Sequence, residues 1–561
     1  MKKLKFILML LLTLPLLGQG QTTWTGTVSR DWDDVSNWSA GLPNSGTDVT
    51  ISSTAYSPVI KGSPLLPAEC RNLTIVSPAV LTIIAGTALT VHGDLVNGSA
   101  KGIEIKSDAN GTGSMIVYGT STGAGTIFAE RYMTNTGWHM VSSPLSGQSV
   151  TLFLGNNITI PKNSSNLRGM MDYDPAANAW NTFFNGTSGK FLGGGKGFCM
   201  RVTLNSAVEF IGSLQVGDQS AVDMSADNWN CIGNPYTSAL HINQNSQTTN
   251  NFLTLNGITN SNIDPLYGIY IWEKPDANNG QSGQYTAISN ASAAYKVQQG
   301  QAFFVKMIAG KTSVSFTSAM QTHLPELTLK STEKVWPTIK LLASASNLKS
   351  STVIAFNSGM TKGLDPTYDA GLFKGGADLA IYSRLVEDYG IPFAIQALPD
   401  NDYKSLVIPI GVDSKTGGEV VFSAELLNLP ADCKVILEDK VTKSFTDLSK
   451  ENYNVTVAAN SVIADRFQLH TSDLISKLGT GILAGTLNAY AIPKTEIRVV
   501  GEVSNNAVAS LYNVQGGVVL IQNLAPGNLN VIPTSNIKTG IYMLSIEDHG
   551  KTKTFKLLIR E

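Results

Sequence analysis

Two pairs of neighbouring carboxyl groups have the side chains that acid–base chemistry requires: Asp172 with Asp174, and Glu438 with Asp439. Hydrolysis of a glycoside needs two such groups held about 5 to 10 Å apart across a cleft. Asp172 and Asp174, followed by Asn178, also have part of the spacing of a calcium-binding loop, but its glycine and closing glutamate are missing. We therefore favour a solvated turn for this segment.

The other catalytic patterns are weaker. None of the six histidines stands in the His-Glu-x-x-His pattern of zinc enzymes. Ser142 and Ser143 follow His139, which pairs a nucleophile with a base, but the aligned positions of an internal repeat hold Gly233 and Asn234. A structural turn explains both copies, and a Gly-Gly-Gly-Lys run lacks the Ser or Thr of a phosphate-binding loop. We expect no catalytic residue, no metal ligand and no cofactor.

Tryptophan side chains offer a different chemistry, because their flat apolar faces can stack on sugar rings. Trp138 and Trp229 each lie inside an alternating run and are predicted to belong to the core. Trp32, Trp38 and Trp180 are the possible ligand-facing aromatics. These three residues are the basis of a carbohydrate-binding hypothesis.

The elements that position these side chains are predicted to be short strands joined by many turns. A chain of 561 residues corresponds to three or four domains at about 150 residues each. Hydrophobic residues make up 42%, charged residues only 15%, and there are 52 glycines and 22 prolines. The formal net charge of -2 gives no electrostatic basis for binding nucleic acid. The composition therefore excludes a coiled coil, a nucleic-acid binder and a polytopic membrane protein.

Residues 1–20 have the organisation of a secretory signal peptide. Lysines precede an apolar run at residues 6–17, and small residues stand at the two positions that a signal peptidase recognises. The run is too short to span a bilayer, which takes about 20 apolar residues, and no apolar run of that length follows it. We predict cleavage between Gly20 and Gln21, and hence export.

Export permits disulfides, but the four cysteines do not suggest a disulfide framework. Cys70, Cys199, Cys231 and Cys433 are widely spaced, and none has a histidine at ligand spacing. Cys199 and Cys231 are the one pair close in sequence. Buried free thiols are the interpretation that we favour.

Residues 21–130 contain a repeat of eight residues. The segments 73–75, 81–83 and 89–91 read Leu-Thr-Ile, Leu-Thr-Ile and Leu-Thr-Val, with a looser echo at 103–105. Each segment alternates as a strand with one buried face does. A strand every eight residues, broken by Gly or Pro, fits either a tight meander or the successive faces of a parallel β-solenoid. We favour the solenoid.

The middle of the chain contains an internal duplication, residues 131–225 and 226–325. A Trp-x-x-x-x-x-Pro element begins at Trp138 in the first copy and at Trp229 in the second. Farther on, a Gly-Lys-Gly-Phe-Cys-Met segment aligns with Gly-Gln-Ala-Phe-Phe-Val. Alternating runs between turns predict that both copies are β-domains.

The remaining regions are also predicted to be β-structure. Residues 326–472 contain alternating runs that suit a β-sandwich, and the Gly- and Thr-rich residues 473–488 are typical of a linker. Residues 489–561 contain five strand candidates separated by Gly-Gly, Pro-Gly and His-Gly turns, which predict a compact Ig-like antiparallel sandwich. The whole chain is therefore predicted to be all-β.

This last segment resembles the C-terminal sorting domain of proteins exported through the type IX secretion pathway of Bacteroidota. The matching residues are Leu511, Tyr512, Gly516, Gly540, Tyr542 and Lys556. The resemblance implies a secreted or outer-surface protein that travels through the periplasm and has the type IX secretion machinery as a partner. In that family the domain is an export address, usually cleaved at the surface.

The rest of the chain is similar to large multi-domain surface proteins of the same bacteria, often labelled adhesin-like, through its Trp-Thr-Gly, Asp-Trp and Asn-Trp opening at residues 24–39. We expect a non-catalytic adhesive or structural protein that binds an extracellular glycan or surface ligand through repeated shallow faces, with affinity from multivalency. Two alternatives stay open: a carbohydrate-binding surface protein that uses exposed aromatics, and a secreted hydrolase with its site in residues 131–472.

Overall fold

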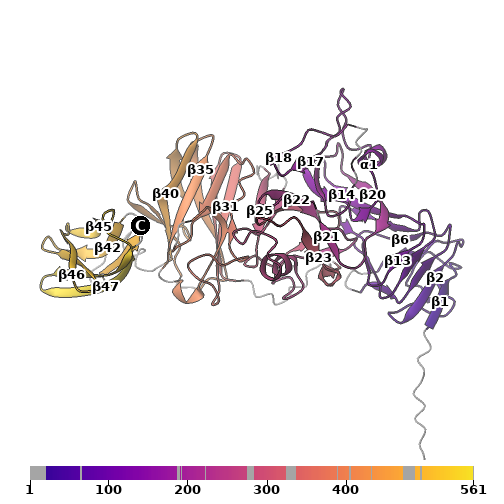
Figure 1. Ribbon diagram of the computed structural model, residues 1–561, viewed down its shortest axis with the longest axis horizontal. Helices are drawn as coiled ribbons and strands as arrows, with labels where there is room; N and C mark the ends of the chain where they lie inside the picture. Colours follow the sequence, from indigo (N-terminus) through magenta and orange to yellow (C-terminus); the bar gives the residue numbers. More distant parts are fainter. Residues whose placement is uncertain are drawn as a thin grey trace, which may run out of the picture.

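The structure is a computed structural model in which the regions of the chain follow one another in an elongated row (Figure 1). It describes residues 20–559 except for 63–65, 186–189, 191, 222, 274–282, 324–335, 388–389, 404–405, 431–432, 472–486 and 493–495. The predicted signal peptide therefore lies outside the described residues up to residue 19, and the predicted linker lies outside them up to residue 486. Almost all regular elements are strands, which confirms the predicted all-β class.

The N-terminal region is a parallel β-solenoid, as the eight-residue repeat predicts. Its elements are β1 (Gly20–Trp24), a 3-10 turn (Val35–Asn37), β2 (Thr47–Ile51), β3 (Val59–Ile60), β4 (Ala68–Cys70), β5 (Leu73–Ile75), β6 (Leu81–Ile83), β7 (Ala88–Val91), β8 (Leu95–Asn97), β9 (Ile103–Ile105), β10 (Ser107–Asp108), β11 (Gly111–Thr112), β12 (Ser114–Val117), β13 (Ser121–Thr122) and β14 (Ile127–Met133). The three segments of the repeat, β5, β6 and β7, lie in three different sheets, so each forms one face of a single rung.

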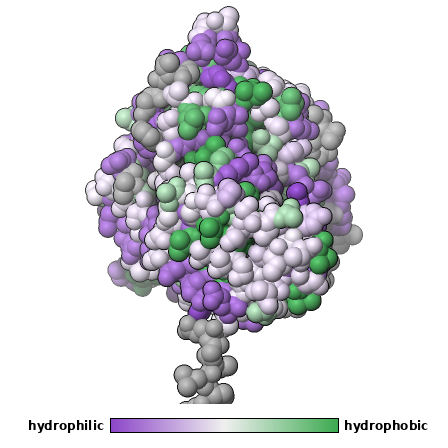
Figure 2. Space-filling model, turned by 90° about the vertical axis from the view of Figure 1, so that its right-hand side faces the viewer, coloured by the Kyte–Doolittle hydropathy of each residue, from purple (hydrophilic) through white to green (hydrophobic). Residues whose placement is uncertain are grey.

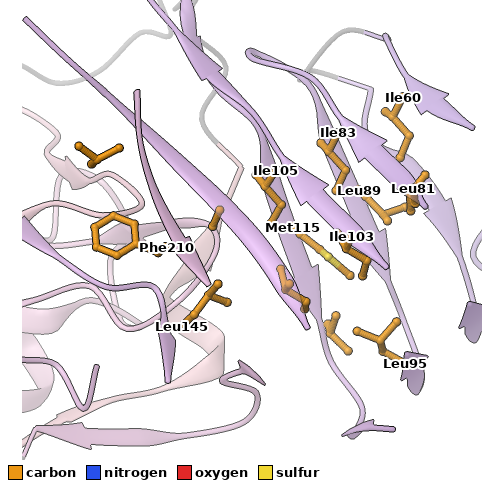
Figure 3. Packing of buried hydrophobic residues seen from close by; sticks show 14 of the residues in the cluster. Ile60, Leu81, Ile83, Leu89, Leu95, Ile103, Ile105, Met115, Leu145 and Phe210 are labelled. Atoms are coloured by element: carbon orange, nitrogen blue, oxygen red, sulfur yellow. The ribbon is translucent and has the colours of Figure 1, made fainter. Parts of the chain in front are cut away.

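Successive rungs stack in register. Leu73 pairs with Leu95 and Leu81 pairs with Ile103, both in parallel strands. A meander would pair these strands antiparallel, so the parallel ladders exclude that alternative. The apolar residue at each end of a segment points inward, and Figure 3 shows these side chains stacked from rung to rung. Leu73, Leu81 and Leu89 are completely buried.

Trp32 and Trp38 are not ligand-facing, and here the structure corrects the sequence prediction. Their side chains are only 2% and 6% exposed. With Trp24 they form edge-on ring contacts of 4.7 to 5.0 Å in the first rung. The indole of Trp38 donates to the carbonyl of Trp32 at 2.8 Å. An end of a solenoid needs a cap over its apolar interior, and these rings fill that position.

The first repeat copy continues the solenoid, which corrects the predicted boundary between 21–130 and 131–225. Strand β14 runs across that boundary and pairs in parallel with β9 and antiparallel with a long strand of the first copy, β20. The two regions consequently share one hydrophobic core (Figure 3), which extends from Trp24 to Phe210.

The two repeat copies share the topology of one sheet. The first contains β15 (His139–Ser142), β16 (Leu145–Ser146), α1 (Val150–Asn156), β17 (Met170–Asp174), β18 (Ala179–Trp180), β19 (Gly197–Met200), β20 (Ser206–Leu214) and β21 (Gln219–Ala221). The second contains β22 (Trp229–Gly233), β23 (Ala239–His241), a π-helical turn (Thr254–Thr259), β24 (Ile269–Glu273), β25 (Gln284–Ile288), β26 (Lys296–Val297), β27 (Ala302–Lys306), β28 (Val314–Phe316), a 3-10 turn (Ser318–Met320) and β29 (Gln321–Thr322). One sheet of each copy has the equivalent strand order, β15-β19-β17-β18 and β22-β27-β24-β25. The second copy has a hydrophobic core of its own.

The next region is a sandwich made from one long sheet. Its elements are β30 (Thr338–Ala345), β31 (Leu348–Phe356), β32 (Ala370–Gly371), β33 (Leu379–Ser383), β34 (Phe393–Leu398), a 3-10 turn (Asp400–Asp402), β35 (Val407–Ser414), β36 (Gly418–Leu427), β37 (Ile436–Asp439), β38 (Ser444–Asp447), β39 (Tyr453–Val457) and β40 (Ser461–His470). Phe422 of β36 and Phe467 of β40 are far apart in the sheet order, yet their rings lie 4.9 Å apart. The sheet therefore folds over on itself and encloses its core between two layers.

The C-terminal region is a smaller antiparallel sandwich at the far end of the row from the solenoid (Figure 1). Its strands are β41 (Asn488–Ile492), β42 (Glu496–Val503), β43 (Val508–Asn513), β44 (Val518–Asn523), β45 (Gly527–Pro533), β46 (Gly540–Asp548) and β47 (Lys551–Ile559). Two of these seven strands, β41 and β45, were not among the five predicted from the sequence.

The surface at the solenoid end is mainly hydrophilic or intermediate in hydropathy, with hydrophobic residues in small separate patches (Figure 2). No helix in the described part of the chain has the length and apolar character that crossing a bilayer requires.

Candidate functional site

A cleft lined by aromatic rings lies where the two repeat copies meet the sandwich, and we call it the aromatic cleft. Its volume is about 640 Å³. Its walls are Tyr173, Asn178, Ala179, Trp180, Trp229, Tyr267, Tyr285, Phe304, Leu372, Phe373, Lys374, Gly375, Gly376, Ile391 and Pro392. Ligand pockets of this size are typically apolar and aromatic with a few polar groups, so the aromatic cleft is the candidate site.

Phe304 forms the floor of the aromatic cleft. It is completely buried in β27, and its ring contacts four other rings at centroid distances of 4.7 to 5.7 Å. Those rings are Tyr173, Trp180, Tyr285 and Phe373. All four are only partly buried, so they have faces left for a ligand, while the floor fixes their positions.

The first repeat copy supplies Tyr173 and Trp180 from a tight hairpin. The two residues pair across β17 and β18 and their rings meet edge-on at 5.4 Å. The Asp174 side chain accepts hydrogen bonds from the backbone N–H groups of Ala176 and Ala177, which forms the turn. The tyrosine hydroxyl donates to Asn178. The structure thus places Trp180 in a ligand-accessible cleft.

The second repeat copy supplies the opposite wall. Trp229 lies in β22 and contacts the ring of Tyr267 at 5.0 Å and the ring of Phe373 at 4.3 Å. Trp229 is half-buried, not fully enclosed as the core prediction expects. Its counterpart Trp138 lies outside the aromatic cleft, where it stacks on Phe183 at 5.8 Å.

The sandwich closes the aromatic cleft with the loop of residues 372–376. Gly375 has a φ of +51°, and a Cβ atom there would lie 2.4 Å from the ring of Tyr285. Only glycine therefore lets this loop lie directly on that ring. Lys374 at the rim is exposed and forms an ion pair with Asp413.

The tyrosine hydroxyls of the aromatic cleft stay protonated. Burial is the main cause that raises the pKa of Tyr173, Tyr267 and Tyr285 above the ordinary value. At neutral pH these phenols are uncharged groups that can donate and accept hydrogen bonds. The site therefore offers apolar faces edged with neutral hydroxyls.

The carboxyl pair Glu438 and Asp439 does not face a cleft. Both side chains are 1% exposed. Glu438 accepts a hydrogen bond from His470 at 2.7 Å and forms an ion pair with Arg498 of the C-terminal sandwich. Asp439 accepts from Arg466 at 2.6 Å, and the partners of its carboxylate lower its pKa to about 2 despite the opposing effect of burial. The two groups stabilise the structure and are not placed for acid–base chemistry.

Most of the other catalytic candidates are occupied as well, but the buried Ser142 hydroxyl has no hydrogen-bond partner among the described residues. Asp172 accepts from Asn181 and forms an ion pair with Lys190. The imidazole Nε2 of His139 lies 2.9 Å from the carbonyl of Thr134, and the Ser143 hydroxyl donates to the backbone. Within the described residues, no group of three or more His, Cys, Asp or Glu side chains is arranged to hold a metal ion.

The cysteines are free thiols, and three of them are buried. Burial raises the pKa of Cys70 and of Cys199 to about 12, and it raises that of Cys231 as well. Such thiols stay protonated at neutral pH, and a protonated thiol is a poor nucleophile.

The residues of the sorting motif lie on three adjacent strands, β43, β46 and β47, and in one turn. Leu511 pairs with Leu544, and Tyr512 pairs with Met543, between β43 and β46. Leu511 and Tyr542 are buried, and the hydroxyl of Tyr542 donates to the carbonyl of Lys538 at 2.7 Å. The other motif residues lie elsewhere in this sandwich: Gly516 in a turn with φ of 80°, Gly540 at the start of β46, and Lys556 exposed on β47. Gly20 and Gln21, the predicted cleavage site, are exposed in β1.

Sequence reasoning missed most of the aromatic cleft. Tyr173 was visible as the tyrosine that precedes Trp180 in the first copy, but Phe373 carries no signal beyond its neighbouring glycines. Phe304 of the second copy aligns with Cys199 of the first. Because the aligned residue is not aromatic, the repeat pattern does not indicate an aromatic site at this position.

Comparisons with known proteins identify the C-terminal region. Residues 491–560 match the family described as "Secretion system C-terminal sorting domain". The resemblance found in the sequence is thereby confirmed, and the protein is secreted or displayed at the cell surface by type IX secretion.

Among solved structures, the chain is similar to one described as "Biofilm associated protein - BSP domain", at 10% identity and a TM-score of 0.17, covering 77% of this chain and 92% of that one. It is also similar to a polysaccharide lyase, at 10% identity and a TM-score of 0.14, covering 52% of this chain and 46% of that one. No curated protein matches the chain. The model of the family described as "Domain of unknown function (DUF8693)" matches residues 23–470, and the chain belongs to that family.

Proposed function

We propose that this protein is a surface-displayed adhesin that holds an extracellular polysaccharide in the aromatic cleft without transforming it. The aromatic cleft is the observation that carries the proposal. Its seven rings come from three regions of the chain that are far apart in sequence, and six of them are only partly buried.

The chemistry of the walls suits a sugar. A pyranose ring has an apolar face of C–H groups and an edge of hydroxyls, so it stacks on an aromatic ring and forms hydrogen bonds around the rim. The indole of Trp180 and the ring of Phe373 supply such faces. Hydrogen-bond partners for the sugar hydroxyls are supplied at the rim by the neutral hydroxyls of Tyr173 and Tyr285 and by the amide of Asn178.

The walls also favour binding over hydrolysis. The polar side-chain groups that line the aromatic cleft are three phenols, two indoles, an amide and the ammonium group of Lys374. Glycoside hydrolysis uses paired carboxyl groups, and the carboxyl group of Asp413 that lies close to this rim is in an ion pair with Lys374. The described lining of the aromatic cleft therefore lacks the carboxyl pair that a glycoside hydrolase uses.

A binding experiment with a matched control tests the proposal. The chain without its signal peptide, here called the mature chain, is compared with its Trp180→Ala and Trp138→Ala variants. Saccharide binding is measured on a glycan array and by calorimetry. Trp138 is the control because it is a half-buried tryptophan of the same copy outside the aromatic cleft. We expect the Trp180 variant to lose binding by about tenfold or more, which is about 1.4 kcal/mol, while the control keeps it.

Two outcomes contradict the proposal. One is an affinity that does not change in Trp180→Ala. The other is the release of reducing ends when the mature chain is incubated with the bound polysaccharide, because that result makes the protein a hydrolase.

A further inference from the structure

A second pocket lies at the same end of the sandwich and shares no lining residue with the aromatic cleft. We call it the Trp336–Tyr368 pocket. Its volume is about 580 Å³. It is lined by Gln244, Asn245, Thr248, Asn290, Trp336, Asn357, Gly359, Met360, Asp365, Pro366 and Tyr368. Two aromatic rings and six amide, hydroxyl or carboxyl side chains thus converge on one hollow.

The two rings form a stacked platform. Trp336 and Tyr368 lie 5.9 Å apart with an angle of 15° between their planes. Both are only partly buried. At that separation nothing fits between them, so a ligand would stack on the outer face of the pair.

The amide groups present their nitrogens to the pocket. The side-chain oxygen of Gln244 accepts a hydrogen bond from the Tyr368 hydroxyl at 2.7 Å, and that of Asn357 accepts from the backbone of Gly359 at 3.1 Å. Each oxygen is therefore engaged by the protein, and the NH₂ group of each side chain has no partner among the described residues. Two donors are left for a ligand.

Acceptors are available beside these donors. Asn245 is anchored through its nitrogen, which donates to the carbonyl of Ser292 at 2.7 Å, and this leaves its oxygen free. The carboxylate of Asp365 accepts two hydrogen bonds from Thr361 and has lone pairs to spare. Asp365 is the one charged group among the lining residues that the structure describes.

The platform is held in place by a strained backbone. Thr367 is fully buried and has a φ of 66°, in the left-handed region that strains a non-glycine residue. Asn290 stabilises it, because its side chain donates to the Thr367 hydroxyl at 2.9 Å and its backbone N–H donates to the Thr367 carbonyl at 2.8 Å. The next residue, Tyr368, is thereby fixed relative to Gln244.

We propose that the Trp336–Tyr368 pocket is a second binding site, specific for a neutral hexopyranose unit of a saccharide. The ring platform fits the apolar face of the sugar, and the alternating donors and acceptors fit its hydroxyl groups. The negative charge of Asp365, with no basic side chain among the described residues of the lining, disfavours uronic acids and other anionic sugars. With the aromatic cleft, this site makes attachment to a polysaccharide bivalent.

The test compares the full mature chain with single-site variants, using neutral cello-, manno- and galacto-oligosaccharides and an acidic oligoguluronate as probes. The variants are Trp336→Ala, Asn357→Ala and, for the other site, Trp180→Ala. We expect a neutral oligosaccharide whose affinity falls about tenfold or more in Trp336→Ala and by a smaller factor in Asn357→Ala. Trp180→Ala should keep the binding of this neutral oligosaccharide to the Trp336–Tyr368 pocket. Oligoguluronate should bind more weakly than the neutral probes.

Each other result overturns one hypothesis or both. If every neutral probe binds Trp336→Ala and Asn357→Ala as it binds the mature chain, the second site is refuted and the aromatic cleft is judged by Trp180→Ala alone. A preference for oligoguluronate also refutes it. If Trp336→Ala abolishes all binding and Trp180→Ala changes none, the second site stands and the aromatic cleft falls. Because Asn357 is on the pocket wall, its variant decides the matter should Trp336→Ala fail to fold.

Discussion

The solenoid interior and the aromatic cleft are both assemblies of large apolar side chains on short strands, and they differ in what covers those side chains. In the solenoid, residues such as Leu81 and Ile103 are completely buried by the rungs above and below. In the aromatic cleft, Trp180 and Tyr285 contact a buried floor and remain partly exposed. Neighbouring rungs bury the solenoid side chains completely. The rings of the aromatic cleft are left partly exposed by the described part of the chain.

The difference teaches that residue type alone does not separate a structural tryptophan from a ligand-facing one. Trp32, Trp38 and Trp180 look alike in the sequence, yet only Trp180 lies in a cleft. The physical distinction is how much of each ring the protein itself covers. Substitutions in the two regions should therefore separate stability from binding.

The largest expected effect is in the solenoid. Trp32→Ala removes a ring that is 2% exposed and contacts Trp38 at 4.7 Å. Loss of a buried aromatic side chain costs about 3 to 5 kcal/mol. We expect a large fall in the urea midpoint of the transition that unfolds the solenoid and the first copy, which share one core. An unchanged midpoint would show that these rings do not close the solenoid.

The solenoid could be predicted from the sequence because the pattern that indicates it is local and periodic. The segments that begin at Leu73, Leu81 and Leu89 occupy the three faces of one rung, so spacing alone carries the geometry. The boundary at residue 130 could not be predicted, because β14 pairs both with β9 and with β20, and 72 residues (134–205) separate β14 from β20. No local pattern records which partner a strand takes.

The aromatic cleft shows why a site is harder to predict than a fold. Trp180 was identified as a possible ligand-facing residue, but its floor, Phe304, lies in the other repeat copy. The cleft is completed by Phe373 of the sandwich. Three separately folded regions must pack together before these rings meet, and sequence periodicity contains no information about that packing.

A second prediction concerns the contact that ties the solenoid to the second repeat copy. His323 lies between the hydroxyls of Thr90, at 2.9 Å, and Ser114, at 2.7 Å. Burial lowers the pKa of His323 to about 4, because the neutral imidazole is favoured there. The stability that this contributes is present above about pH 6.5 and is lost as the pH falls toward 4.

The expected loss is about 2 kcal/mol at pH 5 relative to pH 7, from the difference between the two pKa values. It is measured as the change in the free energy of unfolding in urea at the two pH values. The glutamine in His323→Gln cannot be protonated. The fall in the free energy of unfolding between pH 7 and pH 5 should therefore be smaller in this variant by about 2 kcal/mol. Equal pH dependence in the variant and the original chain would mean that this contact opens before the histidine takes up a proton.

A third prediction concerns a polar ladder at one corner of the solenoid. Asn72 donates to the carboxylate of Asp48 at 2.8 Å and accepts from the backbone of Asp94 at 2.7 Å, so it joins three rungs. Asn72→Ala removes both hydrogen bonds and should cost about 1 to 2 kcal/mol. Chemical denaturation measures the loss, and Asn110→Ala, in an exposed turn, serves as the control. A loss no larger than in that control would show that stacking of the apolar faces holds the rungs without the ladder.

The smallest expected effect on stability belongs to the residue with the largest expected effect on binding. Trp180→Ala removes a half-buried ring from a short hairpin, and the pairing of β17 with β19 does not depend on it. We expect a loss of about 1 kcal/mol or less in the free energy of unfolding, measured under the same conditions as Trp32→Ala. A loss as large as that of Trp32→Ala would place Trp180 among the structural tryptophans. A small loss with unchanged saccharide affinity would contradict the aromatic cleft as a binding site, because the ring would then serve neither purpose. Only a small loss of stability together with a large loss of affinity separates the two regions in the way that their exposure implies.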